Sequence, residues 1–161
     1  MNPIVAVFLV LALTSCGSPA APGAKTRAPT ELIDGLQSYT SPSSLRASFP
    51  GTVDWRVIED SKLPSDDPRP RFDILVVSVP WKYSGYSGEL HLHFVNELLD
   101  ATWFYPDEPE DFFRSTPLEL PSNISRRTRI YRGTSYDGRE YIAWEDTALA
   151  EEQRAWIRRF A

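Results

Sequence analysis

The chain contains almost no cysteine, since Cys16 is the only one among its 161 residues. A single thiol cannot close an intramolecular disulfide, and it cannot provide the several thiolates of a typical structural zinc site. The fold must therefore be stabilised by packing, for which apolar residues, 42% of the chain, are plentiful.

Histidine is nearly as scarce, and the apolar runs are short. The chain has two histidines, His91 and His93, and its N-terminal apolar run covers only residues 4–13. A membrane-spanning helix needs roughly 20 apolar residues, so this run is too short to cross a bilayer. Its length instead fits the apolar core of a secretory signal peptide, about 7–15 residues, although no Lys or Arg precedes it.

The residues that end this run form a candidate lipidation site. They are an aliphatic residue, two small residues and a cysteine, Leu13-Thr14-Ser15-Cys16, and they resemble the lipobox of bacterial lipoproteins. The resemblance implies cleavage before Cys16, a diacylglyceryl thioether on its sulfur and an acyl group such as palmitate on its new amino group. Gly17 stands where an Asp would favour the inner membrane, which implies the periplasmic face of the outer membrane.

The chain divides into three expected parts. Residues 1–15 are expected to be a signal peptide, residues 16–30 a lipidated cysteine with a flexible tether, and residues 31–161 a single globular domain. The tether is rich in Gly, Ser, Pro and Ala, and this composition cannot bury enough apolar surface to fold. The remainder is long enough for one domain with one hydrophobic core.

Apolar periodicity predicts an α+β domain built on an antiparallel sheet. The expected strands are a meander, residues 53–58, 72–79, 89–95 and 98–105, and a C-terminal hairpin, residues 127–133 and 139–144. Residues 72–79 are apolar on both faces and should lie inside the sheet. We expect loops at residues 59–71 and 80–88, and a tight turn at Asn96-Glu97.

N-terminal and C-terminal helices are expected to pack on this sheet. Ser41, which precedes a proline, is a suitable N-cap for a helix that stops at Pro50-Gly51. Asp107 is expected to cap a short second helix, and Asp146 or Thr147 a C-terminal helix.

The two histidines are candidate metal ligands. Alternate residues of a strand point the same way, so His91 and His93 could reach one metal ion, or both could simply lie on the polar face of the strand. Zinc would need further ligands from Asp or Glu. The acidic residues 107–111 lack the spacing of a calcium-binding loop, so a capped, solvated turn is the alternative to a calcium site.

A serine nucleophile is not predicted. Gly85-Tyr86-Ser87-Gly88 begins like the nucleophile elbow Gly-x-Ser-x-Gly, but the fifth residue is Glu89. The sequence therefore predicts no catalytic residues and no cofactor.

Three aromatic residues are candidates for partner binding. Trp81, Tyr83 and Tyr86 fall in the expected loop at residues 80–88, and aromatic side chains in loops can anchor protein interfaces. The alternative is that they fold back over the edge of the sheet and extend the core.

The charge of the chain argues against nucleic acid as a partner, because the formal net charge is −5. Its distribution is uneven. Residues 126–161 hold eight Arg against six acidic side chains, whereas residues 16–125 hold nine basic and sixteen acidic ones. The C-terminal part could therefore face acidic phospholipid or lipopolysaccharide, the alternative being a solvated sheet face.

Residues 41–105 also resemble a known family. The Ser-Pro helix start, the Phe49-Pro50-Gly51 end and the segment Phe94-Val95-Asn96-Glu97-Leu98 resemble SmpA/OmlA (BamE-like) lipoproteins, in which a helix precedes a strand meander. The segment after residue 125 has no counterpart in that family, so another family of small envelope lipoproteins is the alternative.

These features together favour a protein of the bacterial cell envelope. We expect a non-catalytic interaction module, anchored to the membrane through lipid on Cys16, that assists envelope assembly or maintenance with a protein partner. The alternative is a periplasmic ligand- or metal-binding protein, or a hydrolase, that uses His91 and His93.

Overall fold

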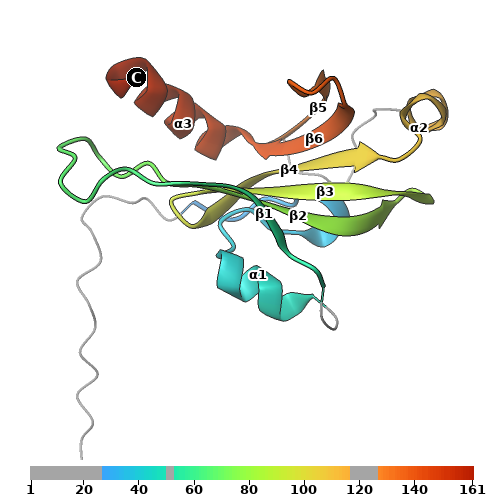
Figure 1. Cartoon of the computed structure of the whole chain (residues 1–161), viewed down its shortest axis with the longest axis horizontal. Helices are drawn as coiled ribbons and strands as arrows, with labels where there is room; N and C mark the ends of the chain where they lie inside the picture. The colour runs from blue at the N-terminus through green and yellow to red at the C-terminus, as the bar shows by residue number, and fades with distance from the viewer. Residues whose placement is uncertain (1–26, 50–52, 117–126) are drawn as a thin grey trace, which may run out of the picture.

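The computed structural model describes residues 27–49, 53–116 and 127–161. The predicted signal peptide, Cys16, the tether up to residue 26 and the helix stop at Pro50-Gly51 lie outside these ranges. Within them the chain forms a six-stranded antiparallel sheet of strand order β1-β2-β3-β4-β6-β5, which confirms the predicted α+β class (Figure 1). In chain order the elements are η1 (Ile33–Gly35), α1 (Pro42–Ser48), β1 (Arg56–Ser61), β2 (Ile74–Tyr83), β3 (Tyr86–Val95), β4 (Leu98–Pro106), α2 (Pro109–Ser115), β5 (Thr128–Thr134), β6 (Glu140–Asp146) and α3 (Thr147–Phe160).

Two tight turns connect the central strands. Ser84-Gly85 joins β2 to β3 and Asn96-Glu97 joins β3 to β4, and all four residues have positive φ. Two-residue turns with positive φ match the natural twist of antiparallel strands. The predicted turn at Asn96-Glu97 is confirmed, and β2 lies inside the sheet, as its apolar pattern predicted.

The predicted loop at residues 80–88 is wrong. The strand β2 continues to Tyr83 and β3 starts at Tyr86, so only two residues turn. Aromatic residues favour strands, and Pro80 is tolerated because the pairing of β2 with β1 ends at Ser78. Pro80 therefore interrupts no ladder between β2 and β1.

Two further boundaries differ from the prediction. The first strand runs over Arg56–Ser61 rather than residues 53–58, because Trp55 turns toward the core, where it contacts Phe49 edge to face. The second helix starts at Pro109 behind Glu108 rather than directly behind Asp107, since proline is favoured at the first helical position.

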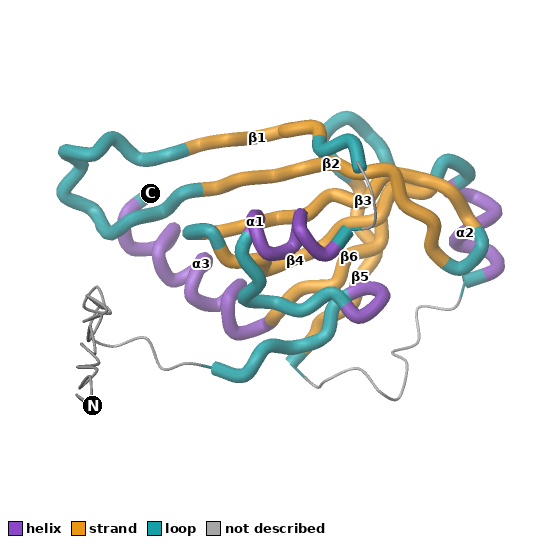
Figure 2. Tube along the Cα trace, turned by 90° about the horizontal axis from the view of Figure 1, so that it is seen from below, coloured by secondary structure: helices purple, strands orange, loops and turns teal. Residues whose placement is uncertain are grey.

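One face of the sheet carries the main hydrophobic core. Its buried side chains, each at most 2% exposed, are Val77, Val79, Leu90, Leu92, Phe94, Leu99, Phe104, Ile142 and Trp144. Leu32 and Ile33 from the N-terminal segment, Leu45 of α1 and Phe112 of α2 complete this core. Figure 2 shows α1 in front of this face and the N-terminal segment passing beside β5.

The N-terminal segment is fixed by buried hydrogen bonds, which we call the N-terminal clamp. The Thr30 backbone N–H donates to Ser38 Oγ at 2.9 Å, and Ser38 Oγ donates to Asp146 Oδ2 at 2.7 Å. Asp146 Oδ1 accepts the backbone N–H groups of Ala148 and Leu149, so the predicted N-cap of α3 is confirmed. One carboxylate therefore caps α3 and holds the start of the described chain.

The helix α3 lies on the side of the sheet opposite α1, and α2 lies at the other end of the molecule (Figure 1). Trp156 attaches the C-terminal half of α3 to the β1–β2 connection. Its Nε1 donates to the Pro70 carbonyl at 2.9 Å, and its ring stacks on Phe72 with centroids 4.2 Å apart.

Candidate functional site

The two histidines lie on the sheet face that points away from the main core, which we call the histidine face. Strand pairing aligns His91 with Trp103, and Trp103 with Ala143. His93, two residues further along β3, is opposite Ala101. The two imidazole rings lie on the same face, as alternation requires, with centroids 6.5 Å apart.

Aromatic rings cover both histidines. The His91 ring lies 4.4 Å from Tyr105, and the His93 ring lies 4.0 Å from Trp103, which stacks in parallel on Tyr141 at 4.5 Å. His91 is only 5% exposed. Burial lowers the pKa of both histidines, that of His93 to about 3, because desolvation penalises the charged imidazolium. Both rings are therefore neutral at physiological pH.

The described residues of this face do not assemble a metal site. Among the residues that the structure describes, no group of three or more His, Cys, Asp or Glu side chains is placed to hold a metal ion. Glu89 approaches His91, with Oε2 3.5 Å from Nε2. The Nε2 atom of His93 is buried and has no hydrogen-bond partner in the described ranges.

Glu89 is the centre of an ionic network across the histidine face. Its Oε1 accepts from Arg56 Nη2 at 2.6 Å, and its Oε2 accepts from Arg139 Nη1 at 3.1 Å. Burial raises the pKa of Glu89, but the hydrogen bond from Arg139 and the charge of Arg56 outweigh it, so the pKa is lowered. Arg139 also bonds Asp137 and lies over the Tyr105 ring at 4.5 Å. The network joins β1 and β3 to the turn that precedes β6.

A groove of about 710 Å³ opens beside this network and is here called the distal groove. Its lining residues are Glu89, Tyr105, Pro106, Asp107, Pro109, Glu110, Gly138, Arg139 and Glu140. Four of them are acidic and one is basic. Asp107 and Glu110, from the acidic segment noted in the sequence, form no ion pair with the residues that the structure describes. The groove therefore favours a ligand or partner segment that carries positive charge.

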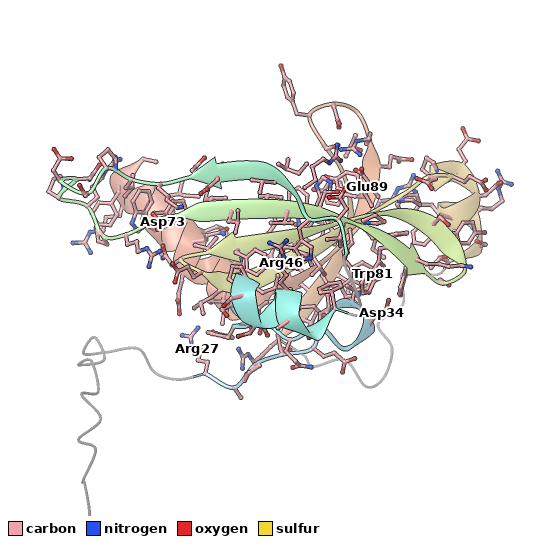
Figure 3. All side chains as sticks on the ribbon, turned by 60° about the horizontal axis from the view of Figure 1, so that its bottom comes forward. Arg27, Asp34, Arg46, Asp73, Trp81 and Glu89 are labelled. Atoms are coloured by element: carbon pink, nitrogen blue, oxygen red, sulfur yellow. The ribbon has the colours of Figure 1, made fainter. Side chains whose placement is uncertain are left out.

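Trp81 lies at the end of β2 and packs toward the core. Its Nε1 donates to Asp34 Oδ2 at 3.0 Å, and its ring meets Phe49 edge to face at 5.7 Å. Figure 3 shows Trp81 beside Asp34, with Glu89 on the opposite side of the sheet. Trp81 also lines a shallow groove with Lys82 and a second, mainly apolar groove of about 330 Å³. Its ring therefore remains available to a partner along one edge.

Tyr83 and Tyr86 are packed more deeply. The Tyr83 ring meets Trp144 edge to face at 5.1 Å, and the Tyr86 ring meets Phe112 at 5.4 Å. The Tyr86 hydroxyl lies 2.7 Å from Ser115 Oγ. Both rings fold back against the sheet and α2, which is the alternative that the sequence left open for these aromatic residues.

Sequence reasoning missed Arg56, Arg139 and Tyr105. Glu89 is separated from Arg56 by 33 residues and from Arg139 by 50, so no local motif links them. Only the strand register brings them together, and no sequence pattern fixes that register in advance.

In the described ranges, which begin at residue 27, no helix is both long and apolar enough to cross a membrane. Comparison with models of protein families, with curated proteins and with solved structures finds no match to this chain, so its function must be inferred from its own residues.

Proposed function

We propose that this protein is a lipid-anchored, non-catalytic interaction module of a bacterial cell envelope. In this proposal lipid on Cys16 holds it at the periplasmic face of the outer membrane, and its domain binds a partner in envelope assembly or maintenance. The sequence supports the anchor through the apolar run at residues 4–13, the lipobox-like residues that follow and the tether rich in Pro and Ala.

The observation that carries the proposal is the N-terminal clamp. The ends of most domains fray unless something ties them down. Here hydrogen bonds to the domain begin within residues 27–30, the first four that the structure describes. Arg127 donates to the Ala28 carbonyl at 2.6 Å, and Thr30 forms hydrogen bonds with both Ser38 and Thr128. A tether that reaches the domain at Arg27 would therefore pull on the sheet and on α3 rather than on a loose end.

The partner surface of this proposal lies at the end of the molecule that carries α2. The distal groove and the groove beside Trp81 share Asp107. Arg27, where the described chain begins, lies toward the end that carries Asp73 (Figure 3). A partner that binds near Trp81 and Asp107 would thus be presented away from the point of attachment.

The anchor is tested by the intact mass of the mature protein extracted from membranes. We expect a chain that starts at Cys16 and carries a diacylglyceryl thioether, and we expect Cys16→Ser to release the protein from the membrane fraction. An unmodified Cys16 in protein recovered from membranes would overturn the anchor.

The partner surface is tested by photo-crosslinking in cells from two exposed positions. A crosslinking residue at Lys82, in the groove beside Trp81, should capture a protein partner, whereas one at Glu151 on α3 should not. If the crosslinking residue at Lys82 gives no protein adduct, the binding role proposed for this end is wrong.

A second candidate function is ligand or metal binding, or hydrolysis, at His91 and His93. One observation favours it, because Glu89 both approaches His91 and lines the distal groove. Two measurements on the purified protein distinguish this second function from the interaction module. They are metal analysis and the binding of a cationic small molecule such as spermidine. Stoichiometric metal, or spermidine binding that Glu89→Gln abolishes, would favour this second function.

A further inference from the structure

The C-terminal half of α3 carries positive charge and has no acidic residue of its own. Residues 153–160 contain Arg154, Arg158 and Arg159 and no Asp or Glu. Arg154 Nη1 lies 3.6 Å from the carboxylate oxygen Oε1 of Glu145. Arg158 and Arg159 form no ion pair within 4.0 Å in the part of the chain that the structure describes. Their charges are free to act on an external surface.

An exposed aliphatic side chain lies among these arginines. Leu149 and Ala150 are buried, and Trp156 packs on Phe72, so these residues form the attached side of α3. Ile157 is 46% exposed and lies between Arg154 and Arg158 along the helix. Guanidinium groups next to an exposed aliphatic residue suit the headgroup region of an anionic membrane, where the charges meet phosphate and the apolar side chain enters the interface.

The chain that leads to the proposed anchor leaves the domain beside this helix. Arg27, the first described residue, pairs with Glu152 of α3 at 3.2 Å. Arg27 lies eleven positions after Cys16, so the reach is at most about 40 Å when fully extended and about 20 Å on average for a flexible chain. A domain tethered at this length keeps α3 within reach of the bilayer surface.

The opposite end of the molecule has the opposite charge. The segment that leads into α2 carries Asp107, Glu108, Glu110 and Asp111. Against these four carboxylates it has one basic side chain, Arg114, which pairs with Asp111 at 3.0 Å. Figure 1 shows α2 and α3 at opposite ends of the sheet. An anionic surface would therefore attract the α3 end and repel the α2 end, which selects one orientation.

We propose that the C-terminal half of α3 docks on the anionic phospholipid headgroups of the membrane that holds Cys16, with the distal groove facing away from it. This inference rests on the proposed anchor. Weak docking is sufficient, because a short tether keeps the domain at an effective concentration in the millimolar range beside the membrane surface. Each arginine near an anionic surface strengthens the attraction by about fivefold, so Arg158 and Arg159 together are sufficient to bias the orientation.

The lipidated full-length protein tests this proposal, because lipid on Cys16 would leave an introduced cysteine as the one free thiol. A fluorophore is attached at Ala155, exposed on α3, or at Tyr136, fully exposed in the β5–β6 turn. Each protein is inserted in vesicles of phosphatidylcholine alone, or with about one quarter phosphatidylglycerol. We expect quenching of the Ala155 probe by a water-soluble quencher to fall severalfold in the anionic vesicles only, and to recover in about 0.5 M salt. The Tyr136 probe should be quenched equally in the neutral and the anionic vesicles.

Charge variants provide the matched control. Arg158→Gln combined with Arg159→Gln should restore quenching of the Ala155 probe, whereas Arg114→Gln at the α2 end should leave it reduced. Equal quenching of the Ala155 probe in both vesicles, with the protein firmly bound to them, would overturn the docking and leave the anchor intact. Protein that remains in the supernatant with an unmodified Cys16 would instead refute the proposed anchor itself.

Discussion

Asp100 and His93 are buried on neighbouring strands, and burial moves their pKa values in opposite directions. Desolvation raises the pKa of Asp100 to about 7, and Gln153 Nε2 donates a hydrogen bond to its Oδ2 at 3.1 Å. Desolvation lowers the pKa of His93 to about 3. Both groups are therefore favoured in their neutral forms by the fold.

The effect on stability follows from the sign of each shift. Asp100 has a higher pKa folded than unfolded, so the folded state binds its proton more tightly. The resulting stability is fully present below pH 3.8 and is lost as the pH rises to about 7. His93 has a lower pKa folded than unfolded, so its contribution is present above pH 6.5 and is lost as the pH falls toward about 3.

The two contributions oppose each other over the pH range in which they overlap. At about 1.4 kcal/mol per pKa unit, each shift corresponds to at most roughly 5 kcal/mol of unfolding free energy. Between about pH 4 and 6.5 the gain from one group offsets the loss from the other. We therefore expect these two groups together to leave the stability of the native protein nearly flat in this range, and single substitutions to reveal a slope.

Asp100→Asn keeps the shape of the side chain and removes its charge. Its unfolding free energy, measured against the native protein, should rise by up to about 4 kcal/mol from pH 4 to pH 7. His93→Phe should give the opposite slope, with its advantage over the native protein growing as the pH falls from 6.5. Urea unfolding followed by tryptophan fluorescence at a series of pH values provides both curves.

The control is Asp66→Asn, which makes the same chemical change at an exposed position in the β1–β2 connection. Its curve should follow that of the native protein. If the Asp100→Asn and His93→Phe curves also run parallel to the native one at every pH, burial does not shift these two groups and the reasoning is refuted.

Three further substitutions test the packing. Asp146→Ala should cost about 3–5 kcal/mol, because it removes the cap of α3, the acceptor of the N-terminal clamp and the carboxylate that pairs with Arg127. Asp146→Asn keeps an acceptor oxygen and should cost clearly less in urea unfolding, so equal losses would contradict the role given to the acceptor oxygens. Gly88→Ala should cost at least about 1–3 kcal/mol, since the new Cβ would lie 2.2 Å from the Tyr105 carbonyl, and an unchanged melting temperature would refute this. Trp81→Phe removes the hydrogen bond to Asp34 and should lower the free energy of unfolding by about 1 kcal/mol. If the variant is as stable as the native protein, this hydrogen bond contributes nothing.

The meander was predictable because its signals are local. Residues 72–79 are apolar on both faces, residues 89–95 alternate, and Asn96 tolerates the positive φ of a tight turn. The edge strand β1 was misplaced for the converse reason. All six of its residues are exposed, so burial leaves no pattern in its sequence, and its position is set by pairing with β2.

The candidate site was only partly predictable. Alternation along β3 placed His91 and His93 on one face, but the sequence says nothing about the aromatic rings that cover them. The stacking of Trp103 on Tyr141 depends on the pairing of β4 with β6, two strands that are separated in sequence by α2 and β5. Contacts between strands so far apart depend on tertiary register, which is why the Glu89 network was also missed.

The clamp at Asp146 links the two proposals physically. One oxygen of this carboxylate caps α3, and the other accepts from Ser38 in the N-terminal segment. The chain that leads toward Cys16 and the helix proposed to dock on the membrane are therefore held by the same fully buried residue. Since buried, satisfied hydrogen bonds hold a fixed geometry, the domain cannot swivel freely about Thr30. A chain that could turn freely about this point would let either end of the sheet meet the bilayer, whereas the clamp and the ion pair between Arg27 and Glu152 hold the chain that leads toward Cys16 against α3.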